Sequence, residues 1–147
     1  MIHAEKMGAI QFDDTRFPLV VVTFNGTATD AEFSDYLARM SELVSRKQKN
    51  VTVFDARSSG VVPAIQRKRQ ADWIAANRQG LKEYSCGSAF VISSAVVRGA
   101  LTAILWLQPI PVSHIVLGSV EEAERWAMQR LVTEGVSPPS WRGRAFR

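Results

Sequence analysis

Two patterns of hydrophobic and polar positions alternate along the chain: short apolar runs, and longer segments in which apolar residues recur every three or four positions. The short runs are typical of strands, and the periodic segments are typical of amphipathic helices. Strands are predicted at residues 10–12, 19–24, 51–54, 88–92 and 114–117. Helices are predicted at about 30–49, 63–84, 94–107 and 120–134. Because strands and helices alternate, we expect an α/β domain with a mostly parallel sheet.

The N-terminal part of the pattern departs from this alternation. The apolar runs at 10–12 and 19–24 flank a polar turn, so they predict an antiparallel hairpin strand at the edge of the sheet. After the hairpin, Thr29 and Glu32 have the spacing of a capping box, in which a hydroxyl oxygen accepts the backbone N–H three residues on. Pro63 is expected at the first position of the second helix. These signals place the helix starts.

The helix predicted after Ser94 is apolar almost all round, and Arg98 is its only charged residue. A sheet covers only the side of a helix that faces it, so the other side needs a second cover. A neighbouring helix of the same domain could provide it, but an exposed apolar patch more often marks an interface. Leu101, Leu105 and Trp106 are therefore the predicted interface residues of a homodimer or of a complex with another protein.

Length and composition indicate one ordinary domain. The chain has 147 residues, and we expect a packed domain at 1–134 followed by a flexible basic tail at 135–147, where Pro and Gly interrupt the periodicity. No apolar run reaches the roughly 18 residues that a membrane span needs, and no secretory signal is recognised. Cys86 is the single cysteine, and no Cys/His cluster is present. We therefore expect a cytoplasmic protein without a metal, a cofactor or a membrane partner.

The net charge of +4 is unevenly distributed. Residues 46–82 carry nine Lys or Arg and two Asp, and the tail at 135–147 adds three Arg. Such a basic segment suits an acidic partner or phosphate, although it is also typical of a solvated helix face. Nucleic-acid binding is not favoured, because no recognition motif and no interleaving of aromatic with basic residues is present.

Several stretches resemble the STAS domains, the sulfate-transporter and anti-sigma-factor-antagonist family with the SpoIIAA-like fold. The resemblance covers roughly residues 10–134 and rests on the leading hairpin, Phe24-Asn25-Gly26 before a capped helix, the strand 51–55 and the stretch 58–60. It extends to a loosely characterised bacterial branch of STAS-like proteins through the stretches 87–91, 97–101, 106–109 and 122–127. The resemblance implies a regulatory or interaction domain and not an established enzyme.

One position departs from the family pattern. In the antagonists of this family the phosphoacceptor serine directly follows the aspartate that ends the third strand, and here Ala56 follows Asp55. Ser58 and Ser59 could take that role only if the loop holds two extra residues. Both are expected at the entrance to the next helix, whose positive end would favour a phosphate group. Alternatively, they are turn residues.

The candidate site residues lie near the end of the strand at 51–54. Carboxyl ends of parallel strands are where open α/β sheets hold ligands, and Asp55 with Arg57, Arg67 and Arg98 could hold a small anion there. The structural alternative is that Asp55 pairs with Arg57 or Arg67, and that Arg98 forms an ion pair inside an interface. No nucleophile, base and acid have catalytic spacing, so no catalytic residue is assigned.

The sequence therefore favours a non-enzymatic regulatory or protein-interaction module, acting through partner binding or self-association. The alternative is a small anion-binding or enzymatic site at the strand ends.

Overall fold

The computed structural model describes residues 4–139. The elements follow the chain in the order β1 (Ala4–Met7), β2 (Ile10–Arg16), β3 (Leu19–Gly26), α1 (Asp30–Ser45), β4 (Asn50–Ser59), α2 (Ala64–Ala76), α3 (Arg78–Tyr84), β5 (Ser85–Val91), α4 (Ala95–Leu107), β6 (His114–Leu117) and α5 (Val120–Thr133). Within the described range the strands form one 6-stranded sheet in the order β1-β2-β3-β4-β5-β6. The first three strands pair antiparallel, and β3 through β6 pair parallel. The predicted α/β class with a mostly parallel sheet and an N-terminal antiparallel hairpin is confirmed.

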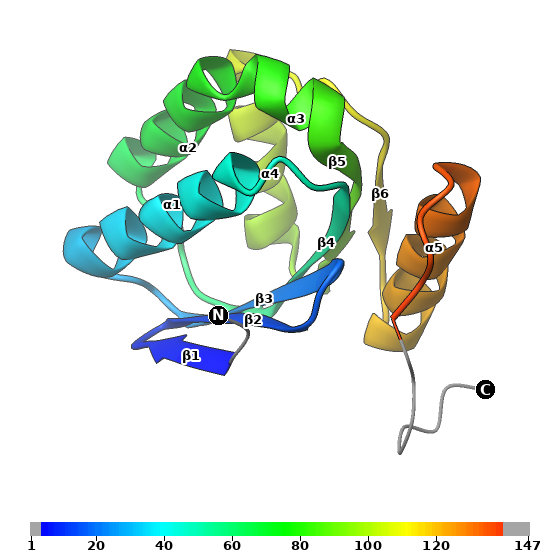
Figure 1. Ribbon diagram of the computed structural model, residues 1–147. Helices are drawn as coiled ribbons and strands as arrows, with labels where there is room; N and C mark the ends of the chain where they lie inside the picture. Colours follow the sequence, from blue (N-terminus) through cyan, green and yellow to red (C-terminus); the bar gives the residue numbers. More distant parts are fainter. Residues whose placement is uncertain (1–3, 140–147) are drawn as a thin grey trace.

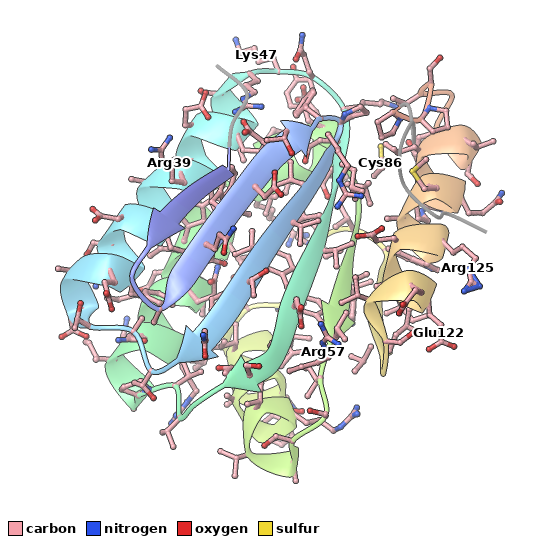
Figure 2. All side chains as sticks on the ribbon, turned by 90° about the horizontal axis from the view of Figure 1, so that it is seen from below. Arg39, Lys47, Arg57, Cys86, Glu122 and Arg125 are labelled. Atoms are coloured by element: carbon pink, nitrogen blue, oxygen red, sulfur yellow. The ribbon has the colours of Figure 1, made fainter. Side chains whose placement is uncertain are left out.

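The helices cover the two faces of the sheet unequally. Helices α1 to α4 lie on one face and α5 lies on the other (Figure 1). On the α5 face, the inward side chains of β4 and β5 pack on the inner side of α5. The buried residues of this cluster are Leu19, Val51, Val53, Cys86, Ala89, Val91, Ala123, Ala127, Met128 and Leu131. Helix α5 packs on β4, β5 and β6 (Figure 2). Leu19, at the start of β3, belongs to the same cluster.

Two smaller clusters lie under the other helices. The α1 cluster joins β2 and β3 to the inner side of α1, and the α4 cluster joins the ends of β4 and β5 to the start of α4. The α1 cluster consists of Ile10, Phe12, Val20, Val22, Phe33, Tyr36, Met40 and Leu43, and the α4 cluster consists of Ala56, Ile92 and Val97. The apolar stripe predicted for the first helix therefore faces the sheet, and the Thr29 and Glu32 capping box is present in full.

The helix predicted over 63–84 is divided into two. Asn77 has φ −109° and ψ 16°, which ends α2, and its side-chain amide donates to the Trp73 carbonyl at 2.9 Å. A side chain that bonds to its own helix end competes with continuation of the helix. Pro63 precedes the first turn of α2 as its N-cap residue instead of occupying the first helical position. The prediction of one continuous helix was wrong for this reason.

The strand β1 is additional to the prediction, and β2 to β5 differ in extent from the predicted strands. β1 was not predicted, because the stretch Ala4–Met7 contains no apolar run; it pairs antiparallel with β2. β4 was predicted to end at Phe54, yet it continues to Ser59, because β3 also continues and pairs Gly26 with Ser59. Pairing with a neighbour thus lengthens a strand beyond its apolar run.

The chain remains packed against the domain for a short distance after α5. After α5, the Val136 N–H donates to the Leu131 carbonyl at 2.8 Å, and the Val136 side chain packs against the α5 cluster. Packing therefore reaches at least two residues past the expected domain boundary at Glu134. Residues 140–147, which form most of the tail expected at 135–147, lie outside the described residues.

Two buried carboxylates tie the hairpin to the helices. Asp14 is 2% exposed and forms an ion pair with Arg46 at the end of α1, while Glu124 is 3% exposed and pairs with Arg16 at 3.1 Å. The Arg46 guanidinium also lies 5.0 Å from the centre of the Phe17 ring. Because a buried charge is costly without a partner, these pairs fix where α1 and α5 meet the hairpin.

We predict that Asp14→Asn lowers the free energy of unfolding by about 1.5 to 3 kcal/mol, the range for a hydrogen bond to a charged group. Urea denaturation followed by circular dichroism measures the change. The control is Asp35→Asn, at an exposed position of α1, which should change stability by less than about 0.5 kcal/mol. Equal effects of both variants would show that the Asp14–Arg46 pair does not organise the hairpin.

Candidate functional site

The end of β4 carries an ion pair formed by two of the predicted site residues. The Asp55 carboxylate accepts from the Arg57 Nε and Nη2 atoms, both at 2.9 Å, and from the Arg57 backbone N–H at 3.2 Å. Asp55 lies on the same face of the strand as Val51 and Val53, which pack on α5. The ion pair is therefore on the α5 face of the sheet. Figure 2 shows Arg57 on this face, at the same end of the molecule as Glu122 of α5.

The charges of this pair satisfy each other. Partial burial raises the pKa of Asp55, but the hydrogen bonds and charge of Arg57 outweigh this effect and hold the pKa of the carboxyl below its ordinary value. The same hydrogen bonds raise the pKa of Arg57, and the charge of Glu121 adds to the effect. Asp55 is therefore ionised at neutral pH and engaged by an arginine, an arrangement that suits a structural pair better than a general base.

The predicted phosphoacceptor positions lie within β4. Ser58 pairs in register with Asn25 and is exposed; the Ser59 hydroxyl donates to the Gly60 carbonyl at 3.0 Å. Since α2 begins only at Ala64, neither serine stands at its first turn, contrary to the expectation that both mark a helix entrance. Ala56 is buried in the α4 cluster. A serine at that position would lie under α4 and not at the surface.

The remaining predicted anion-binding residues do not converge. The Arg67 Nη1 atom donates to the Val62 carbonyl at 2.6 Å, in the loop before α2. Arg98 is exposed on α4, on the layer of helices opposite to the face that carries Arg57. Of the four residues proposed to hold an anion, the structure brings only Asp55 and Arg57 into contact. The alternative in which Asp55 pairs with Arg57 is therefore confirmed.

Much of the basic segment 46–82 is engaged within the domain. Its ion pairs are Arg46 with Asp14 and Glu42, Lys49 with Glu134, Arg57 with Asp55, and Lys68 with Asp72. The Arg69 guanidinium donates to the Ser34 hydroxyl, which links α2 to α1. The surplus of positive charge in the sequence is therefore spread over several internal contacts and does not form one unengaged patch at the candidate site.

The outer side of α4 is apolar and uncovered in the described chain. Trp106 is 87% exposed, and Val96 and Leu107 are each 61% exposed. Ala103 lies between them, and a Cβ atom added at Gly99 would meet no heavy atom within 4 Å. We call these five residues the α4 surface. Of the predicted interface residues, only Trp106 belongs to it; Leu101 and Leu105 are half-buried and face inward.

The sequence did not reveal the cavity that lies between the sheet and helices α1 to α4. Its volume is about 140 Å³, and Leu101, Ile104 and Leu105 of α4 form part of its wall. On its floor the rings of Phe54 and Phe90 are stacked, with centroids 5.1 Å apart and planes 12° apart. Polar side chains also line it, and two of them, the hydroxyls of Thr52 and Ser88, lie on the central strands β4 and β5. The sequence feature that could have indicated the cavity was the presence of the polar residues Thr52 and Ser88 in otherwise apolar strands.

Comparisons with known proteins support the fold. No protein-family model matches the chain. No curated protein matches it either. An uncharacterized DUF3478-family protein with a SpoIIAA-like fold from Shewanella loihica PV-4 superimposes with a TM-score of 0.57 and 11% identity, over 81% of this chain and 92% of that one. An anti-sigma factor antagonist from Mycobacterium paratuberculosis superimposes with a TM-score of 0.54 and 16% identity, over 80% of this chain and 92% of that one. The chain has the SpoIIAA-like fold of STAS domains, as predicted.

Between residues 4 and 139, no group of three or more His, Cys, Asp or Glu side chains is placed to hold a metal ion. In the same part of the chain, no helix has the length and apolar character required to cross a membrane.

We predict that Arg57→Gln raises the pKa of Asp55 toward its ordinary value, because the hydrogen bonds and charge that lower it are removed. A carboxyl titration by NMR measures this shift. A folded-state pKa below the unfolded value contributes stability above the unfolded value of about 3.9, and this contribution disappears as the pH falls through the folded pKa. The stability difference between parent and variant should therefore be present at neutral pH and vanish in acid. A difference that is independent of pH would contradict the electrostatic explanation.

Proposed function

We propose that this protein is a non-enzymatic, STAS-like regulatory module that acts by binding a protein partner or a second copy of itself through the α4 surface. The observation that carries the proposal is the exposure of Trp106, together with Val96 and Leu107, on one side of one helix. The likeness to an anti-sigma factor antagonist supports a regulatory role. The Arg57 guanidinium is engaged by Asp55 and the Arg67 guanidinium donates to the Val62 carbonyl, so the anion-binding alternative has less support.

The chemistry of the α4 surface suits a helix-mediated contact. A large exposed aromatic side chain gains more from burial than a small one, and Trp residues are enriched among those that dominate binding energy. Gly99 and Ala103, one turn apart, allow another helix to approach closely. A two-fold contact of the surface with itself is the commonest arrangement for a self-associating protein.

A cytoplasmic location is part of this proposal. It is supported by the single cysteine, which is buried, and by the burial that raises the pKa of its thiol. Such a thiol is poorly suited to disulfide chemistry, which fits a reducing compartment.

We predict that Trp106→Glu abolishes the association, because it replaces the largest apolar side chain of the surface with a charge. Size-exclusion chromatography with light scattering, at micromolar to high micromolar protein, measures the mass of parent and variant. The matched control is Val132→Glu, which alters a side chain of α5 that is 55% exposed away from the α4 surface, and which should leave the mass unchanged.

A monomeric parent at all concentrations removes self-association and leaves a different protein as the partner. That partner is then sought by capture with the parent and with both variants. A partner that binds the parent and Val132→Glu, but not Trp106→Glu, supports the proposal. Binding that is insensitive to Trp106→Glu overturns it.

A further inference from the structure

We propose that the cavity between the sheet and helices α1 to α4 binds a neutral, mainly apolar small molecule that carries one hydroxyl or carbonyl group. Such a ligand site is distinct from the α4 surface, because the cavity lies on the inner side of α4. The proposal rests on an unfilled apolar space and on two buried hydroxyls that face it.

The apolar walls of the cavity leave a space of about 140 Å³ between them that no side chain fills. Protein interiors are normally close-packed, with few voids larger than a water molecule. Here Phe54 and Phe90 lie on the two central strands of the sheet and are still only half-buried. Leu101 and Ile104 on the facing helix are also half-buried. Because α4 packs on α2 and does not close down onto these rings, aromatic surface in the middle of the domain remains available to a ligand.

Two hydroxyls on the floor of the cavity have no hydrogen-bond partner in the described chain. Thr52 is 4% exposed and Ser88 is 9% exposed. They lie directly beside each other, since Thr52 of β4 pairs in register with Ser88 of β5, and both line the cavity. Buried polar groups are almost always hydrogen-bonded, so a neighbouring pair without partners points to a bound group that supplies them. A hydroxyl or carbonyl oxygen between the two side chains would satisfy both.

The lining also defines the charge and the size of the ligand. Among the residues that line the cavity there is no Asp, Glu, Lys, Arg or His. A carboxylate or ammonium group would lose its hydration there without gaining a counter-charge, which is strongly unfavourable. The volume of about 140 Å³ is close to that of an engineered cavity of about 150 Å³ that admits benzene, so one ring or a short chain fits.

The first experiment uses benzyl alcohol, toluene and benzoate as probes of similar size. The readout is the chemical shift of methyl groups at Val97, Leu101 and Ile104, recorded by NMR during titration of the intact protein. We expect benzyl alcohol to bind and to shift these methyl groups, toluene to bind about five- to tenfold more weakly for lack of one hydrogen bond, and benzoate not to bind. Absence of binding by both neutral probes overturns the proposal, as does binding of benzoate as tight as that of benzyl alcohol.

The second experiment tests the two hydroxyls directly, with the double variant Thr52→Val and Ser88→Ala. If the hydroxyls are unsatisfied in the free protein, removing them raises the melting temperature, and the preference for benzyl alcohol over toluene disappears. The control is Thr23→Val on β3, a residue that does not line the cavity, which should leave the probe preference unchanged. A double variant that melts lower and keeps the preference shows that the hydroxyls serve the fold, and the proposal fails.

Discussion

The close contact between α5 and the two central strands is the constraint on which the rest of the structure depends. Ala123 and Ala127 present small side chains to the sheet and are fully buried, so the helix axis can approach β4 and β5 closely. Gly87 of β5 has a φ of 153°, and a Cβ atom there would lie 2.7 Å from the Trp126 ring. A larger residue at this position would therefore require the Trp126 ring to shift. Dense packing of this face holds β4 and β5 in place whatever covers the other face.

On the opposite face, α1 packs on β2 and β3 through the α1 cluster. Further contacts join Arg46 with Asp14, the Tyr36 hydroxyl with Gln70 at 2.9 Å, and Trp73 with Ser41 at 2.8 Å. These contacts join α1 to the hairpin and to α2. None of them draws α4 onto Phe54 and Phe90. The cavity is thus the space that remains when a firm sheet meets a layer of helices that support one another.

The sequence predicted the features that depend on local pattern. The apolar run at 114–117 became β6 with the same bounds, and Ser94 caps α4 by accepting from the Val96 and Val97 N–H groups. Features that depend on a distant partner were missed. β1 forms because β2 offers a pairing edge, and β4 extends to Ser59 because β3 runs beside it.

The same distinction between local pattern and distant contacts applies to the candidate site residues. The Asp55 and Arg57 pair was predicted as part of the structural alternative, because a partly buried carboxylate is rarely left unpaired. The separation of Arg67 and Arg98 from that pair depends on which face each helix covers, which no local pattern encodes. The cavity could not be predicted from the sequence for a further reason. A void is set by the distance between layers, and Thr52 and Ser88 alone do not reveal how far α4 stands from the sheet.

The two proposed binding sites lie on opposite sides of helix α4. Leu101 and Ile104 face the cavity, while Trp106 and Leu107 face outward. A molecule in the cavity and a protein on the α4 surface would therefore act on the position of one helix. By linkage, each would change the affinity of the other only to the extent that it binds one position of α4 better than another, and the two effects would be equal. The firm packing of α5 means that such a response would be confined to the other layer, because β4 and β5 are held from the opposite side.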